Sequence, residues 1–309
     1  FGIIALIGGL VTVNPIWIFG PYTPDQVSAG TQPDWYIGWL DGALRLMPNW
    51  ENVIAGFTIS WNVLIPSVII PGILFTGLAL YPFLEAWASG DKREHNLLER
   101  PRNAPVRTGI GVAAIVFYGI LWIGGGNDVI ATTFNLSFNA LSWTLRITLI
   151  IGPPIAFLIT KRICLGLQRK DREKLLHGYE SGRVLRLPHG EFIEVHQPLN
   201  YKELAVISAK EDLAVLPAPE KTDADGVRNP TYRVDQLRHK LSSWFLRDNI
   251  TRPTDAEIEA GQAHAAHSAA LEAPLNEYEL QDEDPVGHGG VLHHPGMPMT
   301  NQEQIDQRQ

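Results

Sequence analysis

The stretch Gln32-Pro33-Asp34-Trp35-Tyr36 stands between two apolar segments, residues 1–13 and residues 53–84. It combines a carboxylate with two aromatic rings, and Trp and Tyr are typical of the boundary between membrane and water. The segment before it is too short to span a bilayer and is expected to be the end of a spanning helix. The segment after it is long enough for a full span. The stretch is therefore expected to lie in a loop at a membrane surface.

A short helix is predicted from Asp34 to about Met47, because the proline before it suits the first position of a helix. Asp34 would lie in the first turn, where the helix dipole favours a negative charge. Asp41 follows two turns later and would share a face with Asp34. Two carboxylates on one face could take protons from a lipid-soluble substrate. The plainer alternative is an interfacial helix, with rings that anchor it and acids that are solvated.

Two further apolar segments, residues 108–126 and residues 143–163, are each long enough to cross a bilayer. The sequence therefore predicts an all-α membrane protein with the end of one transmembrane helix and three full transmembrane helices. Pro66 and Pro71 fall inside the 53–84 span, where they are expected to kink the helix.

Charge is distributed unevenly along the chain, since its whole formal net charge of −8 falls after residue 163. The loop 85–107 and the residues directly after 163 are rich in Lys and Arg, whereas the loops 14–52 and 127–142 contain only Arg45. The positive-inside rule places the basic segments in the cytoplasm and the loop with Asp34 on the outer side of a multi-pass cell-membrane protein. The acidic excess argues against a nucleic-acid partner.

The chain is predicted to have three parts: a membrane domain over 1–163, a cytoplasmic extension over 164–250, and a mostly disordered acidic tail over 251–309. The extension is expected to begin with an amphipathic helix over about 165–178. A short β-hairpin is expected around Pro188-His189-Gly190. In the tail, Thr254-Asp255-Ala256-Glu257 resembles a capping box and could begin a helix.

None of the ten histidines lies in a predicted span. A haem b inside the bilayer needs axial ligands there, usually histidine, so these spans are not expected to hold one. A group of histidines in the tail could bind a metal ion, but their low-complexity surroundings argue against it, and no metal site is predicted. These residues are His264, His267, His288, His293 and His294.

The four residues Pro33-Asp34-Trp35-Tyr36 resemble the Pro-Glu-Trp-Tyr signature of cytochrome b, in the Pro-Asp-Trp-Tyr form of actinobacterial members. The number of spans, the order of the loops and the place of the motif resemble the C-terminal half of that subunit. The haem-ligating histidines of the family lie in the N-terminal half. The resemblance implies a subunit, not active alone, of an actinobacterial-type menaquinol:cytochrome c reductase, and a chain that continues a preceding N-terminal half.

In that family the motif borders the quinol-oxidation pocket on the outer, positive side of the membrane. Asp34 would accept a proton from menaquinol and release it outside, although it is one methylene shorter than the usual glutamate. Asp41 could share this relay or bind the quinol hydroxyl. The residues expected to bind the quinol are Pro33, Trp35, Tyr36 and Leu40.

The resemblance also implies the electron acceptors and partners of a respiratory chain. One electron would pass to a Rieske iron–sulfur protein and one to a haem b that residues outside this chain ligate. The implied partners are the N-terminal half of cytochrome b, the Rieske subunit, a cytochrome c subunit, a terminal oxidase, the lipid bilayer and a second copy in a dimeric complex.

Two other hypotheses remain open from the residues alone. The chain could be a non-catalytic membrane anchor or scaffold subunit of a redox complex, with aromatic residues that only mark the membrane boundary. It could also be a transporter fragment, because a span is interrupted by prolines. Transporters usually pair such spans in repeats, and the sequence has no visible repeat.

Overall fold

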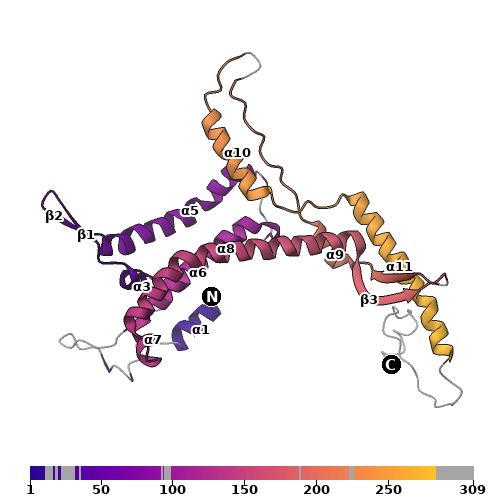
Figure 1. Cartoon of the computed structure of the whole chain (residues 1–309), viewed down its shortest axis with the longest axis horizontal. Coiled ribbons are helices and arrows are strands. Elements are labelled where there is room, and N and C mark those ends of the chain that lie inside the picture. Colours follow the sequence, from indigo (N-terminus) through magenta and orange to yellow (C-terminus); the bar gives the residue numbers. More distant parts are fainter. Residues whose placement is uncertain are drawn as a thin grey trace. The chain divides into compact units, whose positions relative to one another are not determined.

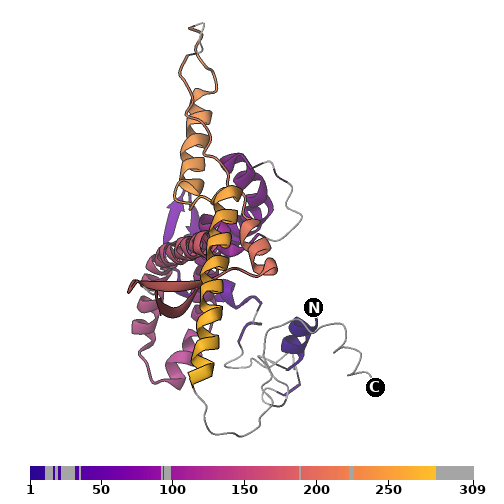
Figure 2. The ribbon, with the colours of Figure 1, turned by 90° about the vertical axis from the view of Figure 1, so that its right-hand side faces the viewer.

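The computed structural model describes residues 1–10, 17, 20–21, 32–34, 36–91, 93, 99–187, 189–222 and 226–282. The described chain is mostly helical (Figures 1 and 2). It divides into two compact units, the first made of Phe1–Leu175 with Tyr201–Thr254 and the second of Leu176–Asn200 with Asp255–Gln309. Besides the elements described below, the first unit contains α1 (Gly2–Leu10), α9 (Tyr201–Ser208) and α10 (Tyr232–Leu246).

Three helices within the described residues are long and apolar enough to cross a membrane. This agrees with the predicted number of full spans. Most of their apolar side chains are exposed in the chain by itself, as expected for surfaces that contact lipid or other subunits. The helices are Trp61–Ser89, composed of α4 (Trp61–Leu64), the π-helical segment η1 (Ile65–Ile69) and α5 (Ile70–Ser89); α6 (Pro105–Gly125); and α8 (Phe138–His177).

The π-helical segment η1 lies where proline interrupts the first of these helices. Pro71 has no backbone N–H and cannot donate to the carbonyl oxygen four residues before it. Just before this proline, the N–H of Ile70 donates to the carbonyl oxygen of Ile65, one residue further back than in an α-helix. The widened turn lets the helix continue past the proline.

The first span begins at Trp61, later than predicted, because the residues before it form a β-hairpin. Strand β1 (Glu51–Ile54) pairs antiparallel with β2 (Phe57–Ser60). Ala55 and Gly56 form the turn with φ values of 52° and 83°, the left-handed conformation that tight hairpin turns need. The predicted start at residue 53 was wrong because a short apolar run is compatible with either a strand or a helix.

Helix α8 continues without interruption through residue 163, where the last span was predicted to end. The amphipathic helix predicted over 165–178 is the second part of α8 and not a separate element. Pro153 and Pro154 also lie within it. Composition changes from apolar to basic along this helix, but Lys, Arg, Leu and Glu all have high helix propensity, so the backbone has no reason to stop. The division of the chain at residues 163 and 250 stays a prediction.

The spanning helices have two ends of different character. Near its C-terminal end α6 packs against α3 (Gly38–Leu46), and Arg146 of α8 donates from Nε to the Leu46 carbonyl oxygen at 2.7 Å. We call this the motif end. At the opposite end of α6, Asp171 of α8 pairs with Arg102 at 2.8 Å. We call this second end, which carries the 85–107 loop, the basic end.

A hydrophobic core at the motif end joins α3 to α6 and α8. Partly buried side chains from the same helices and from α5 surround it. Helix α7 (Asn127–Thr133) follows α6 directly. The fully packed members of this core are Ala43, Leu46, Ile120, Leu121 and Leu145.

Glycines let the backbones of α3 and α6 come close together. A Cβ atom on Gly42 would lie 1.6 Å from the carbonyl oxygen of Leu121, and one on Gly125 would lie 2.4 Å from that of Gly38. Gly38 and Gly42 are four residues apart, the spacing of small residues at close helix contacts in membranes. These glycines therefore fix how deeply α3 docks on a spanning helix.

The second unit contains the predicted β-hairpin and a long helix. Strand β3 (Tyr179–Arg186) pairs antiparallel with β4 (Phe192–Gln197), which confirms the hairpin expected around residues 188–190. Helix α11 (Asp255–Asp282) packs on β4, where the His196 N–H donates to Ser268 Oγ at 3.1 Å.

The tail expected to be mostly disordered is therefore helical over its first part. A helix was predicted there over about residues 254–271 from the capping-box pattern, and α11 begins at Asp255 and continues to Asp282. Its inner face packs against the hairpin. Val195 of β4 and Ala265 of α11 are both fully buried. The rest of the predicted tail, residues 283–309, lies outside the described residues.

Candidate functional site

The motif residues lie just before α3 and not in its first turn. α3 begins at Gly38, and a turn precedes it in which the Ile37 N–H donates to the Asp34 carbonyl oxygen at 2.9 Å. Asp41, not Asp34, is the acidic residue of the first turn. The prediction that Asp34 begins this helix and shares a helix face with Asp41 was therefore wrong, because the Asp34 carboxylate bonds a nearby hydroxyl instead of capping the helix. Trp35 lies outside the described residues.

Asp34 presents an exposed carboxylate held by a neighbouring tyrosine. The Tyr36 hydroxyl donates to Asp34 Oδ2 at 2.9 Å. This hydrogen bond and the negative charge of Asp34 raise the pKa of Tyr36, so the phenol keeps its proton at neutral pH. The pair combines a carboxylate that water can reach with a donor that orients it. Pro33 and Leu40, which are also predicted to bind the quinol, are half-buried.

Asp41 belongs to a different set of charges, centred on Arg45. Arg45 Nε lies 2.6 Å from Asp41 Oδ2, and its Nη1 lies 2.8 Å from Asp128 Oδ1 of α7. The same Nη1 donates to Asn127 Oδ1 at 3.2 Å. Gln32, directly before the motif, donates from Nε2 to Asp128 Oδ2 at 3.1 Å. The arginine therefore connects α3 to α7, and the glutamine connects α7 to the motif.

The two carboxylates predicted to act together have different surroundings. Asp34 is exposed and bonded by a neutral hydroxyl, whereas Asp41 is half-buried and paired with a guanidinium. An ion pair leaves a carboxylate less available to a substrate than a single hydrogen bond does. Of the two, Asp34 is better placed to accept a proton, and Asp41 is better placed to hold Arg45.

Sequence reasoning missed this polar network. Arg45 is the single basic residue of the loops assigned to the outer side, which was a usable signal that it had an acidic partner. Gln32 and Asp128 are 96 residues apart, and no local pattern joins them.

Replacement of Asp128 by asparagine is expected to lower thermal stability more at neutral pH than in acid. Burial alone would raise the pKa of Asp128, but hydrogen bonds from Gln32, from a backbone N–H and from Arg45 together lower it below 3.8. A lowered folded-state pKa stabilises the fold above the unfolded pKa, and that stabilisation is lost as the pH falls through the folded value. Unfolding temperatures of both proteins should therefore differ at pH 7 and converge below about pH 4.

The control for this comparison is Glu259→Gln, which removes an exposed carboxylate from α11. Its unfolding temperature should follow that of the parent at every pH. A constant difference between Asp128→Asn and the parent at pH 7 and in acid would show that the network does not bind the ionised carboxylate.

The described spans do not suit haem ligation. No histidine occurs in Trp61–Ser89 or α6, and α8 has one only at its last residue, His177. Among the residues that the structure describes, no group of three His, Cys, Asp or Glu side chains is placed to hold a metal ion. His264 and His267 lie on α11, and the other histidines of the tail group lie outside the described residues.

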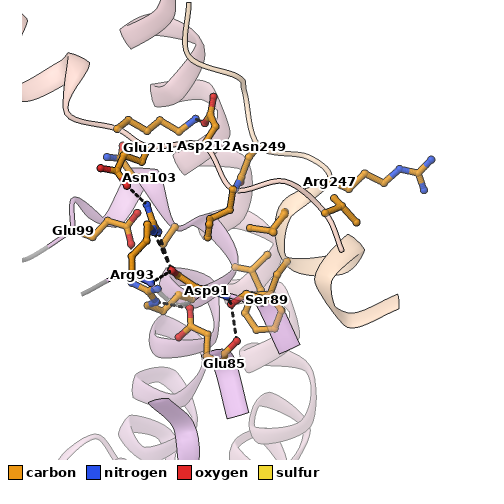
Figure 3. A pocket seen from close by; sticks show the side chains of 18 of the residues that line it. Glu85, Ser89, Asp91, Arg93, Glu99, Asn103, Glu211, Asp212, Arg247 and Asn249 are labelled. Atoms are coloured by element: carbon orange, nitrogen blue, oxygen red, sulfur yellow. Dashed lines mark hydrogen bonds and ion pairs between the residues drawn. The ribbon is translucent and has the colours of Figure 1, made fainter. Parts of the chain in front are cut away.

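A polar cavity of about 280 Å³ lies at the basic end (Figure 3). Two of its arginines are paired within it: Arg107 contacts Glu85 at 2.7 Å and Glu99 at 2.9 Å, and Arg93 contacts Asp91 at 2.8 Å. An anion would have to break these pairs, so we assign the cluster a structural role in joining α5 to α6. Neither this cavity nor the apolar groove along α5 includes Asp34 or Asp41.

The chain is similar to cytochrome b subunits of several actinobacteria. No family model matches the chain. It is 49% identical over 269 residues to the cytochrome bc1 complex cytochrome b subunit of Streptomyces coelicolor, covering 85% of this chain and 49% of that protein. The corresponding subunit of Corynebacterium diphtheriae is 53% identical over 199 residues, covering 64% of this chain and 36% of that protein. The corresponding subunit of Streptomyces lividans is 45% identical over 238 residues, covering 74% of this chain and 43% of that protein.

The chain spans about half the length of the curated relatives it matches, or less. The matched region is the C-terminal part of those proteins, which agrees with the resemblance of the motif and with the helices described above. The chain therefore belongs to the family of actinobacterial cytochrome bc1 complex cytochrome b subunits and corresponds to their C-terminal part.

Proposed function

We propose that this chain forms the quinol-oxidising, outer part of a respiratory cytochrome bc complex that oxidises menaquinol and reduces cytochrome c. Oxidation converts one menaquinol to menaquinone, two electrons and two protons. The electrons leave for redox groups held by other parts of the complex, and the protons leave on the outer side. The observation that carries the proposal is the exposed Asp34 carboxylate, oriented by Tyr36 within a cytochrome b motif and docked on a spanning helix through α3.

In this proposal the residues of the motif end have distinct roles. Asp34 accepts one quinol proton and passes it to water, which reaches its carboxylate directly. Asp41 holds Arg45 and with it the position of α3. Pro33, Trp35, Tyr36 and Leu40 provide the apolar and aromatic wall against which the quinone ring packs.

The proposed orientation follows from charge. The basic end carries Arg100, Arg102 and Arg107 and is placed in the cytoplasm, which puts the motif end outside. Neither the polar cavity nor the apolar groove along α5 includes Asp34, so the pocket is proposed to be completed by the complex. The proposed neighbours are the N-terminal half of cytochrome b, a Rieske iron–sulfur subunit, a cytochrome c subunit and a terminal oxidase, in a dimeric assembly.

The proposal is tested in membranes that contain the whole complex. With a menaquinol analogue as donor, these membranes are expected to reduce cytochrome c, and with a ubiquinol analogue the rate should be lower. Membranes with the other subunits but without this chain should give no quinol-dependent rate. An unchanged rate in the absence of the chain would contradict the proposal, and equal rates with both quinols would contradict the menaquinol assignment.

A further inference from the structure

Helix α10 lies across the end of α5, as both views of the ribbon show (Figures 1 and 2). Arg238 of α10 donates from Nε to the Trp87 carbonyl oxygen at 3.1 Å, and its guanidinium lies 5.7 Å from the centre of the Trp87 ring. Just after α10, Asp248 accepts a hydrogen bond from Lys161 of α8 at 2.6 Å. The helix is therefore attached to the basic ends of two spanning helices.

These contacts set the depth of α10 relative to the membrane. The Trp244 ring stacks on the Phe157 ring of α8, with centroids 5.8 Å apart and planes 11° apart. Phe157 lies one helical turn before Lys161, where the apolar part of α8 gives way to basic residues. Tryptophan is typical of this level, the boundary between hydrocarbon and headgroups. A helix held at this level and across the spans runs along the membrane surface.

One face of α10 carries a row of four apolar side chains, three of which are exposed. Val234, Leu237 and Trp244 are exposed by 52%, 51% and 44%, and the half-buried Leu241 completes the row. Their spacing of three, then four, then three residues places them on a single helix face.

A basic row runs beside this apolar row. Arg233, Lys240 and Arg247 follow one another at intervals of seven residues, so they also share a face, and all three are exposed. Among the ion pairs of the described residues, none involves these three side chains. Figure 3 shows Arg247 directed away from the polar cavity.

We propose that this double row of α10 binds the membrane surface at the basic end, with the apolar row inserted among acyl chains and the basic row on the phosphates of anionic phospholipids. A helix that lies in the interface needs this combination of apolar and cationic faces. Phe83 and Leu84 of α5 and Leu158 of α8, near the same end, are also apolar and exposed. The apolar row therefore continues a surface that faces lipid once α5 and α8 cross a bilayer. The role is independent of quinol oxidation.

The test measures the depth of a nitroxide label at two positions of α10, one on the apolar row and one off it. Leu237→Cys is labelled in a chain whose buried Cys164 is replaced by alanine, and the complex is reconstituted into vesicles of equal parts phosphatidylglycerol and phosphatidylcholine. Gln236→Cys is the matched control, because the side chain of this preceding residue points about 100° away from that of Leu237 and off the apolar row. Collision rates are measured with oxygen, which concentrates in hydrocarbon, and with a nickel chelate, which stays in water.

The label at residue 237 is expected to show a ratio of oxygen to nickel collisions several-fold above that at residue 236. Replacing Arg233, Lys240 and Arg247 together by glutamine should lower this ratio in the mixed vesicles but not in pure phosphatidylcholine. Equal ratios at both positions would show that α10 is in water, and slow collisions with both reagents at residue 237 would show that protein covers it. Either result overturns the proposal, whatever the rate of quinol oxidation.

Discussion

Replacement of Asp34 by asparagine is expected to lower quinol-dependent cytochrome c reduction about 100-fold, since a positioned proton acceptor typically contributes 10²–10⁴-fold. Asparagine has nearly the same shape and can still accept the hydrogen bond from Tyr36, but it cannot take a proton at neutral pH. The fold should not change, because the Asp34 side chain is exposed and makes no contact with the core. The measurement is turnover per assembled complex with a menaquinol analogue.

Asp41→Asn is the matched comparison for Asp34→Asn, because it removes the same charge from the neighbouring helix. Its carboxylate is paired with Arg45, so its loss should act on stability more than on turnover. The variant should keep more turnover than Asp34→Asn while unfolding at a lower temperature. Full turnover in Asp34→Asn would remove the proton-acceptor role and would favour a scaffold subunit instead. A larger loss in Asp41→Asn would transfer the role to Asp41.

Replacement of Gly42 by alanine is expected to prevent stable docking of α3 on α6. The new methyl group would lie 1.6 Å from the Leu121 carbonyl oxygen and 2.7 Å from the Gly125 nitrogen. Both are backbone atoms, so the clash can be relieved only by separating the two helices. Overpacking typically costs about 1–3 kcal/mol, and we expect a loss of about 3 kcal/mol here because no side chain can give way. The yield of assembled complex and its thermal unfolding temperature measure the effect.

Gly119→Ala provides the control within α6 itself. There an added methyl group meets no other heavy atom of the described structure within 4 Å, and alanine has a higher helix propensity than glycine. This variant should therefore be as stable as the parent or slightly more stable. If Gly42→Ala and Gly119→Ala unfold at the same temperature, the close backbone contact between α3 and α6 does not exist in the folded protein.

The same glycines show what could have been predicted of the candidate site. The motif was recognised from four consecutive residues, and the spacing of Gly38 and Gly42 was available as a signal of close helix packing. The residue at which α3 begins could not be predicted from the sequence, because the Asp34 carboxylate had two plausible partners, the helix N-terminus and the Tyr36 hydroxyl. Only the folded chain selects between them.

The number of spanning helices could be predicted from the sequence, but the residue at which the first of them begins could not. A bilayer requires about 20 apolar residues per span, so the number of spans followed from hydropathy alone. The hairpin of the second unit followed from turn residues between two short runs of mixed apolar and charged residues, 183–187 and 191–195. The hairpin of the first unit, which precedes the helix that begins at Trp61, could not be predicted in this way. Its turn residues, Ala55 and Gly56, belong to an uncharged run that has the composition of a spanning helix.

The sequence by itself determined how many helices are long and apolar enough to cross a membrane, which end of them is basic, and which family the motif resembles. These properties depend on composition and on consecutive residues, and a bilayer imposes them on any chain of this pattern. The tertiary structure alone decided that Arg45 pairs with Asp128, that Gln32 holds the motif to α7, and that α10 lies across the end of α5. These contacts join residues far apart in the chain, and only the packing of α3 on α6 and of α10 on α5 and α8 brings their side chains within bonding distance.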